Sequence, residues 1–302
     1  MTGVQHDRQF DPNYGSAVEV ADGIRRLTAP NASPFTFHGT NTYLIGTGSL
    51  TVIDPGPADP KHIETIVSAA KGQKIDRILV SHTHVDHSPG AILLKERTGA
   101  TVIGCGPHVP ARPLGLGETN ALDASGDKTF KADHEVCDGE FLDCGGYRIE
   151  PLSTPGHTEN HLCFAISGSP YLFSADHVMA WSTSIVAPPD GSMRAYMASL
   201  DKMLERGETT YFPGHGGPVR DASAYVSDLK EHRHKREASI RARLGNDPIS
   251  ISDLVDAIYE DLPPNLKPAA ALSVFAQLED LVERQIAKAN PDITLTARYS
   301  AL

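Results

Sequence analysis

The sequence lacks the features of a disulfide-rich or membrane-spanning protein. It has only four cysteines, Cys105, Cys137, Cys144 and Cys163, and no C-x-x-C pair, so neither a zinc knuckle nor a disulfide framework is indicated. Residues 1–15 contain no apolar segment of a secretory signal, and no uninterrupted apolar run approaches the length needed to cross a bilayer. We therefore expect a cytoplasmic protein with no membrane partner.

An excess of positive charge is also missing. The 302 residues include 27 Lys and Arg against 38 Asp and Glu, a formal net charge of −11 at pH 7. Such a balance disfavours a protein that coats nucleic acid by bulk electrostatic attraction. The hydrophobic share of 40% and the charged share of 22% are those of an ordinary globular chain, long enough for one large α/β domain with a small appendage. What the sequence does have is 14 histidines, and histidine is the commonest metal ligand.

The hydrophobic pattern of residues 1–219 predicts one α/β domain. After an opening of short strands and turns, apolar residues recur at helical spacing behind Pro60, and an apolar strand follows. The expected helices are 60–70 and 91–97, and the expected strands are 18–20, 24–27, 41–45, 50–53, 75–80, 101–103, 148–152, 162–166 and 171–173. The histidine motifs directly follow strands, at the sheet edge where α/β proteins place their chemistry.

Residues 220–302 predict a second, smaller unit. The expected elements are a polar helix at 221–243, a linker at 245–248, amphipathic helices at 251–259 and 272–282, and a strand at 293–299. Two helices followed by a small β-ribbon are typical of a winged-helix-like domain. We therefore expect such a domain after the larger one.

One loop carries four candidate metal ligands within six residues. The strand at 75–80 runs into the sequence S-H-T-H-V-D-H, which places His82, His84, Asp86 and His87 close together. Imidazole and carboxylate groups bind zinc, iron and manganese alike. The alternative interpretation is a solvated polar loop that happens to be rich in histidine.

Three more candidate ligands follow separate strands. They are His157 in T-P-G-H-T, Asp176 in F-S-A-D and His215 in P-G-H-G. Each alone is a weak signal, because a histidine after a Pro-Gly turn is more often a surface or hydrogen-bonded residue. Together the seven side chains supply five imidazoles and two carboxylates, enough for two metal ions that share one carboxylate and keep positions open for water.

The order of these motifs resembles the metallo-β-lactamase superfamily over residues 17–219. The resemblance implies an αββα sandwich that holds two zinc ions per chain, with iron or manganese as alternatives. It implies that the first metal binds His82, His84 and His157, that the second binds Asp86, His87 and His215, and that Asp176 bridges them. It further implies that Asp54, in I-D-P-G, orients ligand histidines; a turn or capping aspartate before Pro55 is the alternative interpretation.

A site of this kind implies hydrolysis. Two cations that share a water lower its pKa so that hydroxide exists at about pH 7, and they polarise the electrophile as Lewis acids. Asp86 is the expected catalytic carboxylate, because it can accept the proton of the attacking nucleophile while it binds the second metal. A serine nucleophile is not required, and the sequence has no G-x-S-x-G elbow.

The metal ligands do not select the substrate among esters, thioesters, lactams and phosphodiesters. Residues 221–302 resemble the C-terminal extension of the lactamase-beta-2-like subgroup, in which some members cleave single-stranded RNA. We therefore weigh a small-molecule ester or thioester equally with an RNA phosphodiester. A hydroxyacylglutathione hydrolase-like thioesterase is the nearest enzyme alternative, although its glutathione-binding residues are not identifiable here. A true β-lactamase is less expected without a signal peptide.

The alternative of another class is a nucleic-acid-binding protein with a metal-sensing domain. The predicted polar helix contains six basic residues and only two acidic ones, Glu231 and Glu237, which gives a local net charge of +4. Such a patch can contact phosphates, and the alternative interpretation is a solvated helix face. The six basic residues are Lys230, Arg233, Lys235, Arg236, Arg241 and Arg243. For His161 we expect packing or hydrogen bonding, whereas the role of His177 and the oligomeric state stay open.

Overall fold

Two β-sheets form the larger part of the protein, which is described by a computed structural model over residues 4–115, 118–260 and 262–302. The first sheet has the order β1-β2-β3-β4-β5-β6-β7, antiparallel from β1 to β4 and parallel from β4 to β7. Its strands are β1 (Val18–Ala21), β2 (Ile24–Thr28), β3 (Asn41–Ile45), β4 (Leu50–Ile53), β5 (Ile75–Val80), β6 (Thr101–Gly104) and β7 (His134–Glu135).

The second sheet has the order β13-β12-β11-β10-β9-β8 and is antiparallel except for the parallel pair β11 and β12. Its strands are β8 (Leu142–Cys144), β9 (Tyr147–Ser153), β10 (Leu162–Ile166), β11 (Tyr171–Ala175), β12 (Thr210–Pro213) and β13 (Val219–Arg220). Strands β9, β11 and β12 therefore point the same way, and their carboxyl ends lie at one edge.

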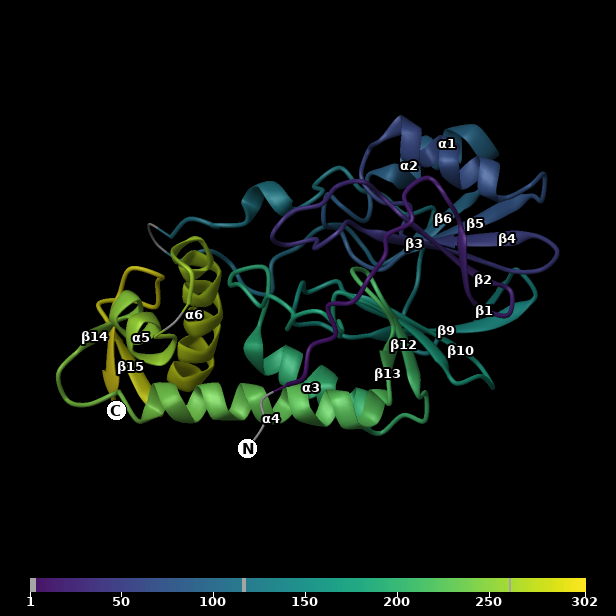
Figure 1. Ribbon diagram of the computed structural model, residues 1–302. Coiled ribbons are helices and arrows are strands. Elements are labelled where there is room, and N and C mark those ends of the chain that lie inside the picture. The colour runs from purple at the N-terminus through teal and green to yellow at the C-terminus, as the bar shows by residue number, and fades with distance from the viewer. Residues whose placement is uncertain (1–3, 116–117, 261) are drawn as a thin grey trace.

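Helices cover the outer face of each sheet (Figure 1). On the first sheet lie α1 (Pro60–Ala69) and α2 (Gly90–Thr98), and on the second lie α3 (Met193–Leu204) and α4 (Ala222–Arg241). Side chains alternate across the buried strands: Tyr43 and Ile45 pack between the sheets, whereas Leu44 packs under α1 and α2. The result is the αββα sandwich that the sequence predicts.

The C-terminal unit contains α5 (Ile251–Ile258), α6 (Lys267–Glu283) and a small sheet of order β14-β16-β15. The strands of this sheet are β14 (Ile249–Ser250), β15 (Ala287–Asn290) and β16 (Arg298–Ala301). The predicted strand at 293–299 is wrong over most of its length, because residues 291–297 form the connection between β15 and β16. The pairing of β15 with β16 leaves the Ile-Thr-Leu-Thr run at 293–296 in the connection between these strands, despite its high β propensity.

Helix α4 joins the two units. Its Val226 and Leu229 pack in the core under the second sheet, and its Ile240 packs in the core of the C-terminal unit with α5 and α6. Figure 1 shows this helix running along one side of both. The boundary between residues 219 and 220 stays a prediction, because α4 belongs to both cores.

Sequence reasoning missed helix α3, although its signals are present. Ser192 caps the helix by accepting a hydrogen bond from the backbone N–H of Ala195, and Met193, Tyr196 and Leu200 recur at helical spacing on its buried face. Among the described residues, no helix is both long enough and apolar enough to span a bilayer.

Candidate metal centre

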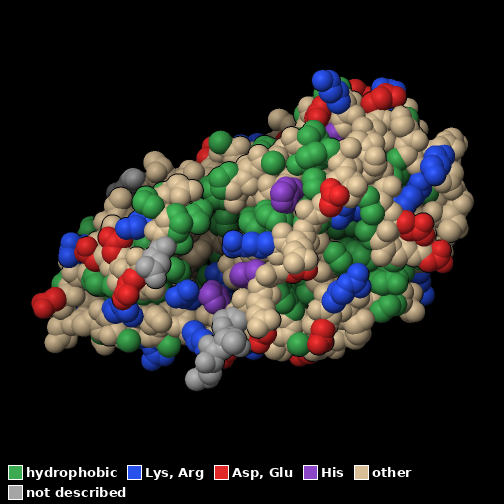
Figure 2. All heavy atoms as spheres, viewed as in Figure 1, with side chains coloured by type: hydrophobic (Ala, Val, Ile, Leu, Met, Phe, Trp, Pro, Cys, Tyr) green, Lys and Arg blue, Asp and Glu red, His purple; other side chains and the backbone are tan. Residues whose placement is uncertain are grey.

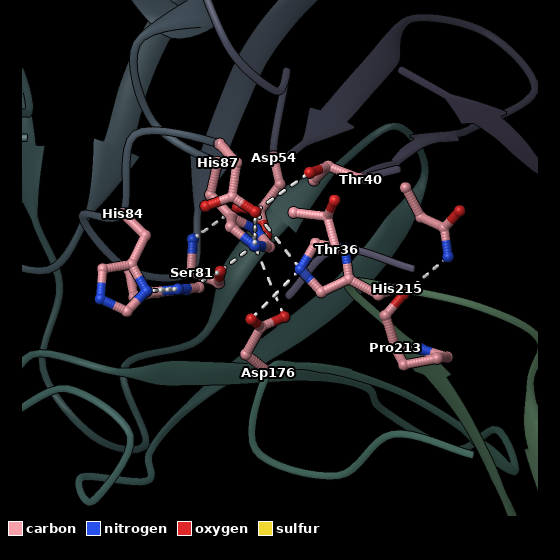
Figure 3. Close-up of polar contacts among 12 residues, drawn as sticks. Thr36, Thr40, Asp54, Ser81, His84, His87, Asp176, Pro213 and His215 are labelled. Atoms are coloured by element: carbon pink, nitrogen blue, oxygen red, sulfur yellow. Dashed lines mark hydrogen bonds and ion pairs between the residues drawn. The ribbon is translucent and has the colours of Figure 1, made fainter. Parts of the chain in front are cut away.

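The predicted metal ligands lie in loops that follow the carboxyl ends of strands. His82, His84, Asp86 and His87 follow β5 of the first sheet, and the other three follow β9, β11 and β12 of the second sheet. Because the two sheets face each other, these loops meet at the shared edge of the sandwich (Figure 3). The structure therefore brings together all seven side chains that the sequence singles out.

The first group consists of His82, His84 and His157. The Nδ1 atom of His84 lies 3.0 Å from Nε2 of His82 and 2.9 Å from Nε2 of His157. These three nitrogens form one of the clusters in this part of the chain that can hold a metal ion.

The second group consists of Asp86, His87 and His215. The Oδ2 atom of Asp86 lies 3.3 Å from Nε2 of both histidines. Asp176 lies between the two groups, with Oδ1 at 3.4 Å from Nε2 of His87 and Oδ2 at 3.2 Å and 3.6 Å from Nε2 of His215 and His157. This is the position that a shared carboxylate requires.

The outward-facing nitrogens of three histidines have backbone carbonyl or hydroxyl oxygens as partners. Nδ1 of His157 lies 2.6 Å from the carbonyl oxygen of Ile185, and Nδ1 of His215 lies 3.1 Å from that of Gly39. Nδ1 of His82 lies 3.0 Å from the Ser81 hydroxyl. A carbonyl oxygen accepts only, so His157 and His215 carry a proton on Nδ1, and their Nε2 atoms point into the site.

Asp54 orients His87. Its Oδ2 accepts hydrogen bonds from Nδ1 of His87 at 2.9 Å and from the Ser81 hydroxyl at 2.6 Å, and its Oδ1 accepts from the backbone N–H of Ser81 at 2.8 Å. Asp54 is buried directly after β4, with φ at 48°. The aspartate that caps a helix is instead Asp59, at the start of α1.

Burial and charge set the protonation states of the centre. Burial, with neighbouring imidazoles, lowers the pKa of His84 to about 3 and that of His82 well below its usual value. Burial acts against protonation of His215 too, but Asp176 and Asp86 outweigh it and raise the pKa to about 9. Burial opposes ionisation of Asp176, yet His215 and His87 lower its pKa well below the usual value. The carboxylates are therefore ionised and the first histidine group is neutral at pH 7, whereas His215 carries a proton that a binding metal ion would displace.

The residues of the centre fit divalent cations. Among the described residues, Nε2 of His87 and Oδ1 of Asp176 are buried and have no hydrogen-bond partner. Gly214 leaves the space beside them free, because a Cβ atom there would lie 2.7 Å from Cε1 of His87 and closer still to Asp176. Imidazole nitrogens and carboxylate oxygens that converge on one buried space are the donor set of zinc, iron and manganese sites.

Some contacts of the centre carry no signal in the sequence. The hydroxyl of Thr40 donates a hydrogen bond to Oδ2 of Asp86 at 3.1 Å. The backbone carbonyls of Gly39 and Ile185 accept hydrogen bonds from Nδ1 of His215 and His157. His161 is buried, with Nδ1 2.8 Å from the Thr154 hydroxyl, so the expectation of packing and hydrogen bonding is confirmed.

His177 packs against helix α3. Its ring is buried and meets the ring of Tyr196 edge-on, with 4.9 Å between the ring centroids. Neither ring nitrogen has a hydrogen-bond partner among the described residues. The contacts of this side chain are therefore packing contacts.

Each basic residue in the run 230–243 has a partner within the protein, and the last of them, Arg243, lies just beyond the end of α4. Their partners are Asp201 for Lys230, the Ser184 carbonyl for Arg233, Glu231 for Lys235, the Tyr259 ring for Arg236, Glu237 for Arg241 and the Ala257 carbonyl for Arg243. On the face shown in Figure 2, positive and negative side chains are interspersed. Of these partners, Glu231 and Glu237 are already counted in the local charge of +4, Asp201 adds one further negative charge, and Arg233 is buried away from solvent.

The chain belongs to the metallo-β-lactamase superfamily: residues 35–215 match the family model described as Metallo-beta-lactamase superfamily. Residues 250–294 match the model described as Beta-lactamase associated winged helix domain. Both the family and the winged-helix-like unit predicted from the sequence are thereby confirmed. With its His and Asp clusters, the protein is a metal-dependent hydrolase of this superfamily.

Known relatives extend over nearly the whole chain. A Beta-lactamase-like protein 2 homolog of Drosophila melanogaster is 30% identical over 274 residues, which cover 88% of this chain and 90% of that protein. An Atrochrysone carboxyl ACP thioesterase of Claviceps purpurea is 24% identical and covers 91% of this chain and 84% of its own length. A beta-lactamase domain protein from Burkholderia ambifaria has the same fold, with a TM-score of 0.80 at 20% identity over 98% of this chain and 96% of that one.

Proposed function

We propose that this protein hydrolyses thioesters with two divalent metal ions, zinc in the first instance. The observation that carries the proposal is the convergence of seven side chains from both sheets, with neutral imidazoles in one group and ionised carboxylates in the other. His82, His84 and His157 would hold one ion and Asp86, His87 and His215 the other, with Asp176 shared between them. Bound there, the ions would supply Lewis-acid polarisation of the substrate carbonyl and a lowered pKa of water.

The chain supplies orientation and proton transfer. The partners of the Nδ1 atoms fix the histidine rings, so their Nε2 atoms face the site before any ligand binds. The side chain of Asp86 is 21% exposed, whereas that of Asp176 is 9% exposed and that of His87 is fully buried. Asp86 makes its contacts to His87 and His215 through Oδ2. We propose Oδ1 of Asp86 as the atom that accepts the proton of the attacking water.

Two observations favour a thioester over an RNA phosphodiester. Relatives that align over most of this chain include proteins named as acyl carrier protein thioesterases, at 24% and 26% identity. The basic side chains of residues 230–243, which would be needed along a phosphate backbone, have partners within the protein. The small-molecule substrate, the identity and number of the metal ions, and the cytoplasmic location remain proposals.

The test is hydrolysis by the purified full chain, with its metal content measured in parallel. The substrates are a short S-acyl N-acetylcysteamine thioester, an S-acylglutathione, an aryl ester, a chromogenic β-lactam and single-stranded RNA, each with and without a chelator. We expect about two metal equivalents per chain and chelator-sensitive hydrolysis that is fastest on a thioester. Turnover of S-acylglutathione above the other thioester would instead identify a glutathione-dependent enzyme.

A pair of variants separates the centre from the rest of the molecule. Asp86→Ala should abolish hydrolysis and reduce the metal content by one equivalent. Asp201→Ala is the matched control, because it removes an exposed carboxylate that pairs with Lys230 on the outer helices. Full activity in metal-free protein would refute the proposal, and cleavage of RNA alone would move the substrate to the phosphodiester class.

A further inference from the structure

Arg233 lies buried where the polar helix of the sequence was expected to face solvent. The residue is only 4% exposed, and its Nη2 donates a hydrogen bond to the backbone carbonyl of Ser184. The guanidinium also lies over the ring of Tyr196, with 5.1 Å between its central carbon and the ring centroid. From α6, the amide of Gln277 donates to the carbonyl of Arg233 at 3.3 Å. Burying a charged guanidinium costs free energy, so we expect the contacts of Arg233 to be needed to hold it in this position.

The carbonyl that Arg233 holds lies between two contacts of the metal centre. The hydroxyl of Ser184 donates to the backbone carbonyl of Asp176 at 2.5 Å. The next carbonyl along the chain, that of Ile185, accepts from Nδ1 of His157 at 2.6 Å. A shift of this short segment would therefore displace one ligand histidine and the shared carboxylate together.

Helix α4 holds the same loop at a second point. The hydroxyl of Tyr225 lies 2.8 Å from the carbonyl of Met179 and 3.1 Å from that of Ala180. Tyr225 and Arg233 are separated by about two helical turns, so they project from similar faces of α4. The helix that joins the two units thus runs beside the loop and holds it at both points.

We propose that Arg233 is a positioning residue of the metal centre, which fixes the Ser184–Ile185 segment and through it the ring of His157. The inference rests on the metal function proposed above. Helix α4, which joins the two units, would then help to position a ligand of the metal centre. The hydrogen bonds that aim ligand histidines are worth about 10- to 100-fold in metal affinity, and Arg233 acts on one of them from a single residue away.

The test measures metal release from the zinc-loaded full chain into a chromogenic chelator. In Arg233→Met we expect the equivalent held by His157 to leave about tenfold faster than in the wild type, while the other, which is affected only through Asp176, is accelerated less. Arg233→Lys keeps the charge and one donor, so its release rate should fall in between. The visible absorption spectrum of cobalt-substituted Arg233→Met should likewise differ from that of the cobalt-substituted wild type.

Two control variants separate positioning from charge and from stability. Lys235→Met removes an exposed positive charge from the same helix, and Val226→Ala weakens the core under α4 without a polar contact to the loop. Both should release zinc as the wild type does.

Three results would overturn the inference. They are wild-type release in Arg233→Met, equal acceleration of both equivalents in step with Val226→Ala, and failure of both Arg233 variants to fold, which would make the residue part of the folding core. A wild-type protein that binds no metal would refute the proposed function as well, so the two failures are distinguishable.

Discussion

Replacing Asp54 by asparagine is expected to weaken metal binding at the His87 group by one to two orders of magnitude. Asparagine has the same shape and tolerates the left-handed backbone conformation at this position, where φ is 48°. The amide oxygen of asparagine can still accept the hydrogen bond from the backbone N–H of Ser81. The amide NH₂ cannot accept from Nδ1 of His87, however, so the ring must lose this bond or move its proton to Nε2, the nitrogen that faces the site.

The expected magnitude follows from the bond that is lost. The carboxylate of Asp54 is 2% exposed, and its hydrogen bond to His87 is 2.9 Å long. A buried hydrogen bond to a charged group contributes about 1.5–3 kcal/mol. At about 1.36 kcal/mol for each factor of ten, this corresponds to a 10- to 100-fold loss of affinity, which is also the range expected for partners of ligand histidines.

The assay is competition for zinc between the apoprotein and a fluorescent chelator of known affinity. Asp59→Asn is the matched control: Asp59 also precedes a proline, but it caps α1 by accepting from the backbone N–H of Lys61 at 2.9 Å. Asparagine caps a helix about as well as aspartate, so this variant should bind zinc like the wild type. If Asp54→Asn bound both equivalents within about twofold of the wild type, the orienting role would be refuted.

Three further changes test other parts of the reasoning. Gly214→Ala should abolish metal binding in a folded protein, because the added methyl group enters the space between ligands, whereas Gly217→Ala, whose Cβ has no neighbour nearer than 3.8 Å, should bind normally. Burial lowers the pKa of His62 from 6.5 to about 4, so between these pH values only the unfolded chain binds the proton, and the apoprotein loses about 3 kcal/mol of stability as the pH falls. His62→Gln should remove this loss in urea unfolding at pH 7 and pH 4.5, and an unchanged pH dependence would contradict the assignment. Glu279→Gln removes a carboxylate of α6 that pairs with Arg112. It should lower the free energy of unfolding by about 1–2 kcal/mol in the same assay and should speed hydrogen exchange in residues 106–115. Equal exchange in the variant and the wild type would show that α6 does not hold that segment.

The sequence by itself predicted the candidate ligands and the presence of a small C-terminal unit. The H-x-H-x-D-H string follows a predicted apolar strand, as do His157 and Asp176, whereas β12, the strand before His215, is seen only in the structure. The amphipathic helices at 251–259 and 272–282 likewise predict the C-terminal unit, which the family comparison confirms. Local signals sufficed because ligand types and hydrophobic period are properties of short segments. The segment at 293–299 shows the limit, since its β propensity lost to the pairing of β15 with β16.

Only the tertiary structure decided what surrounds the ligands. Asp54 could have capped a turn, and its contact with His87 exists because β4 and β5 lie side by side in the first sheet. The carbonyls of Gly39 and Ile185 leave no mark in the sequence, since every residue has one. Arg233 sits in a run of charges that reads as a solvated face, and it is buried because of the elements that pack on α4. Sequence encodes which groups are available, whereas the orientation of each group depends on neighbours that are distant along the chain.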